Sequence, residues 1–139
     1  MHRPMHCQSA VIVAAARASV GTRFRAQGRL PGVALDCVGV VLAAAAAIGV
    51  TVTVPPYALG GDHESDLDEL IAATGCSAVA VAAPGDLLTV APGPGRRHLG
   101  VVTDCGVVHA HAGLGRVVEG PVDPAWTVLG AWRLPEGAE

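Results

Sequence analysis

Residues 36–49 read DCVGVVLAAAAAIG, and this run decides the fold because it predicts a helix that begins at a cysteine. Asp36 stands at a position typical of an N-cap, where a short polar side chain can accept hydrogen bonds from the free amides of the first turn. Five alanines follow, and alanine has the highest helix propensity. Gly49 stands where a helix would end. We expect a helix from about Cys37 to Ile48.

One further helix is expected before this run and another after it. Ser9 can cap a helix that continues to about Ser19. Residues 65–75 resemble the opening of another helix, because their apolar side chains recur at helical spacing. The stretch between the first two helices, residues 21–34, is interrupted by glycine, proline and arginine, so we expect a loop there.

The pattern changes after Gly75 to short β-prone pieces bounded by proline and glycine, which is typical of strands. Five or six strands are expected, from residues 77–83, 86–90, 98–103, 106–111, 116–119 and 126–133. Helices first and strands afterwards predict an α+β fold, in which N-terminal helices pack on a small antiparallel sheet or barrel. At 139 residues the chain is about the size of one domain, so residues 1–139 are expected to form a single one.

Composition argues against several kinds of partner. The net charge is −3 and the nine basic residues are all arginines without a basic stripe, so nucleic acid is not an expected partner. The apolar run at residues 38–50 has 13 residues, whereas a membrane-spanning helix needs about 20, so no membrane association is expected. Arg3, the apolar residues 10–16 and the residues 16–18 together imitate a signal peptide with its cleavage site. We read the same N-terminal residues as a short amphipathic helix. The four cysteines lie far apart, which favours free thiols.

Cys37 is a candidate nucleophile because of its position at a helix start. A thiol attacks as its thiolate, and the free amides and the dipole at a helix N-terminus favour that anion. The same amides can hold the oxyanion of a tetrahedral intermediate. Cysteine is also among the most buried residue types, so the alternative is a structural role as a small apolar residue.

The base for such a nucleophile has to come from elsewhere in the chain, and two histidines stand at suitable places. His98 opens one predicted strand and His109 lies near the end of the next, so an antiparallel pairing of the two strands can bring their rings together. His111 shares a sheet face with His109, which makes it a rival for the role of orienting the base. The alternative is that all three are polar residues at the rim of a sheet.

Short motifs follow one another in a fixed order along the chain. Around Cys37 stand GTRF at residues 21–24, QGR at 27–29 and VALDCVGV at 33–40. Downstream come PGDLL at 84–88, HLGVV at 98–102, VHA at 108–110, GRVVE at 115–119 and a final segment at 126–135. In this order, over about residues 14–135, the chain resembles the NlpC-type cell-wall peptidases, especially their phage and gene-transfer-agent branch.

The resemblance implies a papain-like NlpC-type fold and a cysteine peptidase. By position, Cys37 is the nucleophile, His98 the general base and then acid, and His109 the orienting group. The family cuts amide bonds in the stem peptides of peptidoglycan through an acyl-enzyme, and it requires no metal or cofactor. The branch implies a place on the tail of a virion or phage-like particle, with tail-tip or hub proteins as partners.

The resemblance also assigns substrate binding to Asp36 and Phe24. Many members have tyrosine where Phe24 stands and serine where Val38 stands, and both hydroxyls are associated with holding the free amine of the stem peptide. Asp36 could still pair with an ammonium group, although a helix cap is an equally good role for it. We read these departures as altered recognition.

Three alternatives to an endopeptidase stay open. The first is a structural tail-tip or hub protein that keeps the fold without activity, and the second is an amidase that cuts the stem from the glycan. The third is a small zinc module, for which Cys105, His109 and His111 supply three ligands at a usable spacing.

Overall fold

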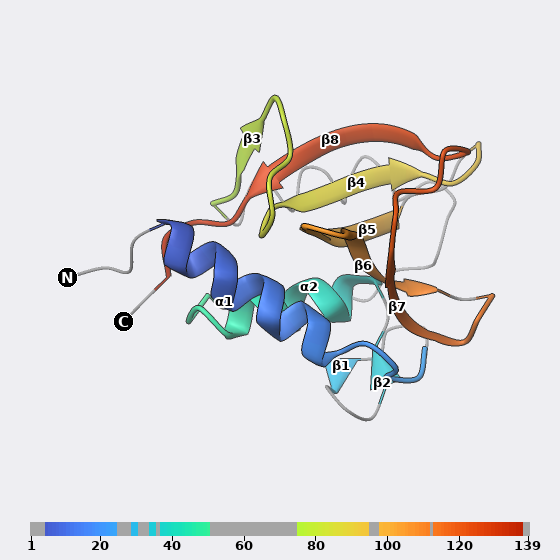
Figure 1. Cartoon of the computed structure of the whole chain (residues 1–139), viewed down its shortest axis with the longest axis horizontal. Helices are drawn as coiled ribbons and strands as arrows, with labels where there is room; N and C mark the ends of the chain where they lie inside the picture. Colours follow the sequence, from blue (N-terminus) through green and yellow to red (C-terminus); the bar gives the residue numbers. More distant parts are fainter. Residues whose placement is uncertain are drawn as a thin grey trace.

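Two helices pack against one face of an antiparallel sheet in the structure, a computed structural model (Figure 1). It describes residues 5–24, 29–30, 34–35, 37–50, 75–94, 98–111 and 113–137. The helices are α1 (Met5–Ala18) and α2 (Cys37–Ala46). This mixture of helix and antiparallel sheet agrees with the predicted α+β class. No helix in these ranges is long and apolar enough to cross a membrane.

The sheet has six strands in the order β3-β8-β4-β5-β6-β7, and all neighbours are antiparallel. Their bounds are β3 (Ser77–Val79), β4 (Leu87–Ala91), β5 (His98–Thr103), β6 (Gly106–His111), β7 (Arg116–Gly120) and β8 (Thr127–Arg133). The six predicted strands are thus confirmed, and β5 and β6 agree with the prediction residue for residue. β3 is shorter than predicted because the chain bends after Val79, where the Asp86 carboxylate accepts a hydrogen bond from the Ala83 amide at 2.8 Å.

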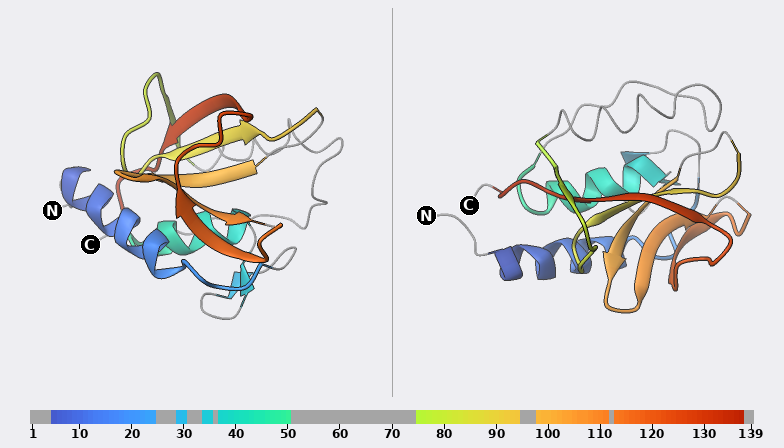
Figure 2. Two further views of the ribbon diagram at one scale, coloured as in Figure 1. Left: turned by 45° about the vertical axis from the view of Figure 1, so that its right-hand side comes forward. Right: turned by 90° about the horizontal axis from the view of Figure 1, so that it is seen from above.

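Helix α2 begins at Cys37, as predicted. After Ala46 the chain makes one more turn, and Gly49 follows with a positive φ of 76° that suits glycine at a helix end. Ala44 and Ala45 have no exposed surface, so the small side chains let the helix lie close to its neighbours. Figures 1 and 2 show α2 beginning beside the two short strands β1 (Arg29–Leu30) and β2 (Ala34–Leu35) and running antiparallel to α1.

Two predictions for the first half of the chain need correction. Helix α1 does not start at Ser9 but at Met5, since the buried Gln8 side chain holds this extra turn against the C-terminal segment. Gln8 Nε2 donates to the Pro135 carbonyl at 2.9 Å, and its Oε1 accepts from the Gly137 amide at 2.7 Å. The expected loop over residues 21–34 contains β1 and the first residue of β2, which pair antiparallel. The helix predicted over residues 65–75 lies outside the described residues, except for Gly75, which is in a turn.

Strand alternation divides the apolar side chains between the two faces of the sheet. Toward the helices, the largest cluster of buried side chains joins α1 and α2 to Leu99, Val101, Val108, Ala110 and Val117. On the other face, Leu88, Val90 and Ala131 form a second cluster with Val102 and Trp126 against it. Burying one such aliphatic side chain contributes roughly 1.5–3 kcal/mol, so both faces stabilise the sheet.

Charged side chains hold the edges of this arrangement. Arg17 on α1 binds both carboxylate oxygens of Glu119 on β7, at 3.0 and 3.1 Å, and it also pairs with Asp104 in the β5–β6 turn. The buried Asp86 accepts two hydrogen bonds from Arg133 on β8, at 3.0 and 3.1 Å. These contacts fix α1 on the sheet and β8 beside the start of β4.

Candidate functional site

Cys37 is the first residue of α2 and lies within the core between that helix and the sheet. Its exposure is 3%, and α2 packs on β5 and β6. The position at the helix start follows from the sequence, since the alanine-rich run propagates a helix from this point. The thiol therefore stands where the helix dipole favours an anion. Asp36, the predicted cap and substrate-binding residue, lies outside the described residues.

His98 and His109 form a hydrogen-bonded pair. Nε2 of His98 is 2.9 Å from Nδ1 of His109, and the two rings meet edge to face with centroids 5.0 Å apart. His98 is the first residue of β5 and is half-buried, whereas His109 on β6 is only 6% exposed. The prediction that neighbouring antiparallel strands bring these rings together is confirmed. The roles of base and orienter stay predictions.

Both elements that carry the candidate residues begin at the same end of the sheet. Strand β5 starts at His98 at the end where α2 starts at Cys37, and both then run toward the chain termini (Figures 1 and 2). The segment leading to α2 is tied to this end as well, because the Phe24 amide donates to the Gly115 carbonyl, in the turn after β6, at 2.8 Å. By alternation, His98 and His109 belong to the face opposite Leu99 and Val108. Cys37 belongs to the buried cluster on the helix side of the sheet, so the juxtaposition of its thiol with His98 stays a prediction.

Trp126 is a residue of this site that the sequence analysis missed. Its ring meets both imidazoles edge to face, with centroids 5.5 Å from His98 and 5.0 Å from His109. Together with Leu88 and Val90 the three rings line a small apolar pocket on the face away from the helices. Trp126 shields the hydrogen bond between the imidazoles from water. Its place depends on the pairing of β8 with β4, which no short-range pattern reveals.

Burial sets the charge state of His109. It lowers the pKa of His109 to about 4, and the neighbouring His111 ring acts in the same direction. The centroids of these two rings are 5.8 Å apart. His109 is therefore neutral at physiological pH.

His111 has a different set of contacts from its rival. Its Nδ1 accepts a hydrogen bond from the Leu114 amide at 3.0 Å, which fixes the ring to the β6–β7 turn. Of the two candidate orienters, His109 makes the hydrogen bond to His98.

The ligand set of the zinc alternative is not brought together. Cys105 lies in the β5–β6 turn, 3.6 Å from a guanidinium nitrogen of Arg17. His109 is four residues further along β6, which corresponds to about 13 Å in an extended strand. Within the described ranges no three His, Cys, Asp or Glu side chains gather as a metal site.

Phe24 is half-buried and packs against the same core cluster that contains Cys37. Its ring is therefore on the helix side of the sheet, whereas the imidazole pair lies on the other side. A direct contact between Phe24 and a substrate stays a prediction.

No model of a known protein family matches this chain, and no curated protein matches it.

The low pKa of His109 predicts a pH dependence of stability. The pKa is about 4 in the folded protein and near the ordinary 6.5 in the unfolded chain, so between these values only the unfolded chain binds the proton. The free energy of unfolding therefore keeps its full His109 contribution above pH 6.5. As the pH decreases toward 4, this contribution falls by at most roughly 3 kcal/mol. Urea unfolding at several pH values between 7 and 4 measures this slope.

The control is His109→Asn, which keeps a hydrogen-bonding atom near the place of Nδ1 but does not titrate. Its free energy of unfolding should change less over this pH range than that of the native protein. Equal slopes in both proteins would show that His109 is protonated in the folded state near pH 6.

Proposed function

We propose that this protein is a cysteine hydrolase of papain-like NlpC-type fold that cuts amide bonds in peptidoglycan stem peptides. The observation that carries the proposal is the hydrogen-bonded pair of His98 and the neutral His109 at the end of the sheet where α2 begins with Cys37. A nucleophile, a base and an orienter are the three parts that thiol catalysis of acyl transfer needs. The substrate class comes from the motif resemblance.

In the proposed mechanism His98 acts through Nδ1. Its Nε2–H donates to Nδ1 of the neutral His109, and this hydrogen bond fixes the tautomer whose basic nitrogen is Nδ1. His98 takes the proton from the Cys37 thiol at Nδ1, and the thiolate sulfur attacks the carbonyl carbon of the scissile amide. The free amides of the first turn of α2 stabilise the resulting oxyanion.

Collapse of the tetrahedral intermediate then breaks the C–N bond. His98 gives its proton to the departing nitrogen, so the amine leaves neutral and a thioester remains on Cys37. A water molecule, deprotonated by His98, attacks this thioester, and the second tetrahedral intermediate releases the carboxylic acid while the proton returns to the thiolate. Because the pKa of His109 is about 4, the orienter stays neutral throughout this cycle.

The test is a digestion of purified sacculi of several wall types with the full chain, with products identified by mass spectrometry. We expect fragments cut within the stem peptide. Cys37→Ala should release nothing, and Cys105→Ser, a matched change of an exposed thiol, should leave the products unaltered. Circular dichroism checks that both variants are folded.

Other outcomes separate the remaining alternatives. Intact stem peptides released from the glycan would mean an amidase. The absence of products from all wall types would favour a structural protein of a phage-like tail that keeps the fold without turnover. Products that persist with Cys37→Ala would overturn the assignment of the nucleophile.

A further inference from the structure

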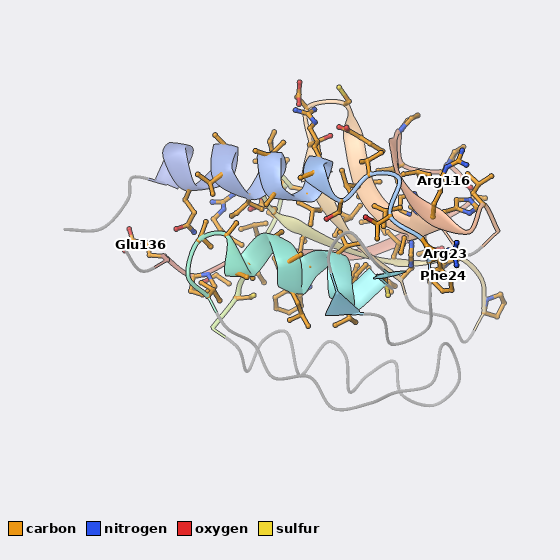
Figure 3. All side chains as sticks on the ribbon, turned by 90° about the horizontal axis from the view of Figure 1, so that it is seen from below. Arg23, Phe24, Arg116 and Glu136 are labelled. Carbon is orange, nitrogen blue, oxygen red and sulfur yellow. The ribbon has the colours of Figure 1, made fainter. Side chains whose placement is uncertain are left out.

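Two arginines stand directly opposite each other at the end of the sheet that carries the imidazole pair. Arg23, in the segment after α1, forms an antiparallel bridge with Arg116, the first residue of β7. The flanking hydrogen bonds run from Phe24 to Gly115 and from Val117 to Thr22, both at 2.8 Å. This is a non-hydrogen-bonded pair, in which side chains lie closest. Figure 3 shows both arginines at the end of the molecule opposite Glu136.

The arginines share a sheet face with the candidate site. Val117 is fully buried in the cluster next to the helices, so Arg116 points to the opposite face, and Arg23 as its direct partner does too. On that face Arg116 lies opposite His111 in the register of β6 and β7. His111 on β6, Arg116 on β7 and Arg23 in the segment after α1 thus form a row across the sheet. This row lies beside the pair formed by His98 and His109.

Among the described residues, no carboxylate forms an ion pair with either of these two positive charges. Both arginines are exposed, and no ion pair in this part of the chain includes either of them. Asp86 is bound to Arg133, while Asp104 and Glu119 are bound to Arg17. Like charges directly opposite each other destabilise a sheet. An oxyanion between the two guanidinium groups would remove this repulsion, and guanidinium groups are suited to binding carboxylates with two hydrogen bonds.

We propose that Arg23 and Arg116 form a binding site for a carboxylate of the peptide substrate. Neighbouring strands are about 5 Å apart, so Arg116 on β7, two strands away from β5, lies roughly 10 Å from His98, the proposed base. An extended peptide covers that length with about three residues at roughly 3.3 Å each. The site therefore selects peptides with a carboxylate about three residues from the cleaved amide. The inference rests on the proposed function for the place of that amide.

The test measures binding and not turnover, so that it stands apart from the test of the hydrolase. Full-length Cys37→Ala protein is titrated calorimetrically with a synthetic stem tetrapeptide that has free carboxyls, and with the same peptide after conversion of its carboxyls to amides. Arg23→Gln combined with Arg116→Gln should weaken binding of the acidic peptide about tenfold, because two exposed ion pairs are lost. The corresponding double lysine variant, which keeps the charges, should lose less. Binding of the amidated peptide should be weak and the same in all three proteins.

Three results would overturn the proposal. The first is equal affinity of the acidic and amidated peptides, and the second is tighter binding of inorganic phosphate or a glycerol phosphate oligomer than of the acidic peptide, which would identify a phosphate site. The third is a clearly lower urea midpoint of the double glutamine variant, since removal of two opposed like charges should leave that midpoint unchanged or raise it. If sacculi stay intact but the protein still prefers the acidic peptide in an arginine-dependent way, the carboxylate site is supported and the proposed hydrolase activity is contradicted.

Discussion

His98→Ala should reduce the rate of stem-peptide cleavage about a thousandfold or more, to the level of the Cys37→Ala variant. General acid–base catalysis alone contributes about 10²–10⁴-fold, and members of one catalytic unit lose activity together and not additively. Without the imidazole the thiol has no acceptor for its proton and the amine has no donor. The measurement is the initial rate of fragment release with each single variant and with the double variant. A double variant much slower than either single one would contradict a shared step.

His109→Ala should have a smaller effect, about ten- to a hundredfold, because His109 orients the base without touching the scissile bond. His109→Asn should recover part of this loss, since its amide can replace Nδ1 at the hydrogen bond of 2.9 Å to His98. His111→Asn is the matched control and should be nearly neutral. A larger loss at His111 than at His109 would identify His111 as the orienter, and equal small losses at His98 and His109 would mark both as structural residues.

Gly100→Ala should destabilise the protein by about 1–3 kcal/mol and lower its activity as well, because the added methyl group would clash with β6 next to His109. A Cβ at Gly100 would stand 2.3 Å from Cγ2 of Val107, 3.1 Å from the Val108 carbonyl oxygen and 3.4 Å from Cβ of His109. The clash involves backbone as well as side chain, so β6 has to shift, and His109 shifts with it. Urea unfolding and the cleavage rate are the two measurements.

The control for Gly100 is Gly120→Ala in β7, where an added Cβ meets nothing within 4 Å. It should leave both stability and activity close to native. Val107→Ala removes the nearest clash, so the double variant of Gly100 and Val107 should be more stable than the sum of the two single losses. Additive losses would contradict the proposed contact.

Local chemistry was sufficient to predict α2, β5 and β6. Cys37 begins its helix because a strong run of helix formers follows. Strand β5 begins at His98, and the turn at residues 104–105 separates its end from the start of β6. The start of α1 could not be predicted in this way. Its first turn depends on Gln8 and a hydrogen bond to Pro135, a contact between residues far apart in the chain.

The candidate site was predictable to a similar extent. His98 and His109 follow from their places on successive strands, whose antiparallel pairing is the simplest connection. Trp126 and the pair of arginines depend on sheet neighbours that are remote in sequence: β8 lies beside β4, and Arg23 lies beside β7. Such pairings have no signature in spacing or composition, because they are decided by which buried faces fit together.

The place of β8 between β3 and β4 has a consequence for folding during synthesis. Until residues 127–133 have left the ribosome, β4 has a neighbour on one side only and β3 has none, so the edges of both strands stay open. Sheets built from such non-local pairings fold slowly, and exposed edges are places where two nascent chains can join wrongly. Cys37 and His98 are made well before that strand, yet the ring of Trp126 over the imidazoles and the bond between Arg133 and Asp86 form only when the last strand inserts. Completion of the sheet and assembly of the imidazole pocket are therefore a single, late event.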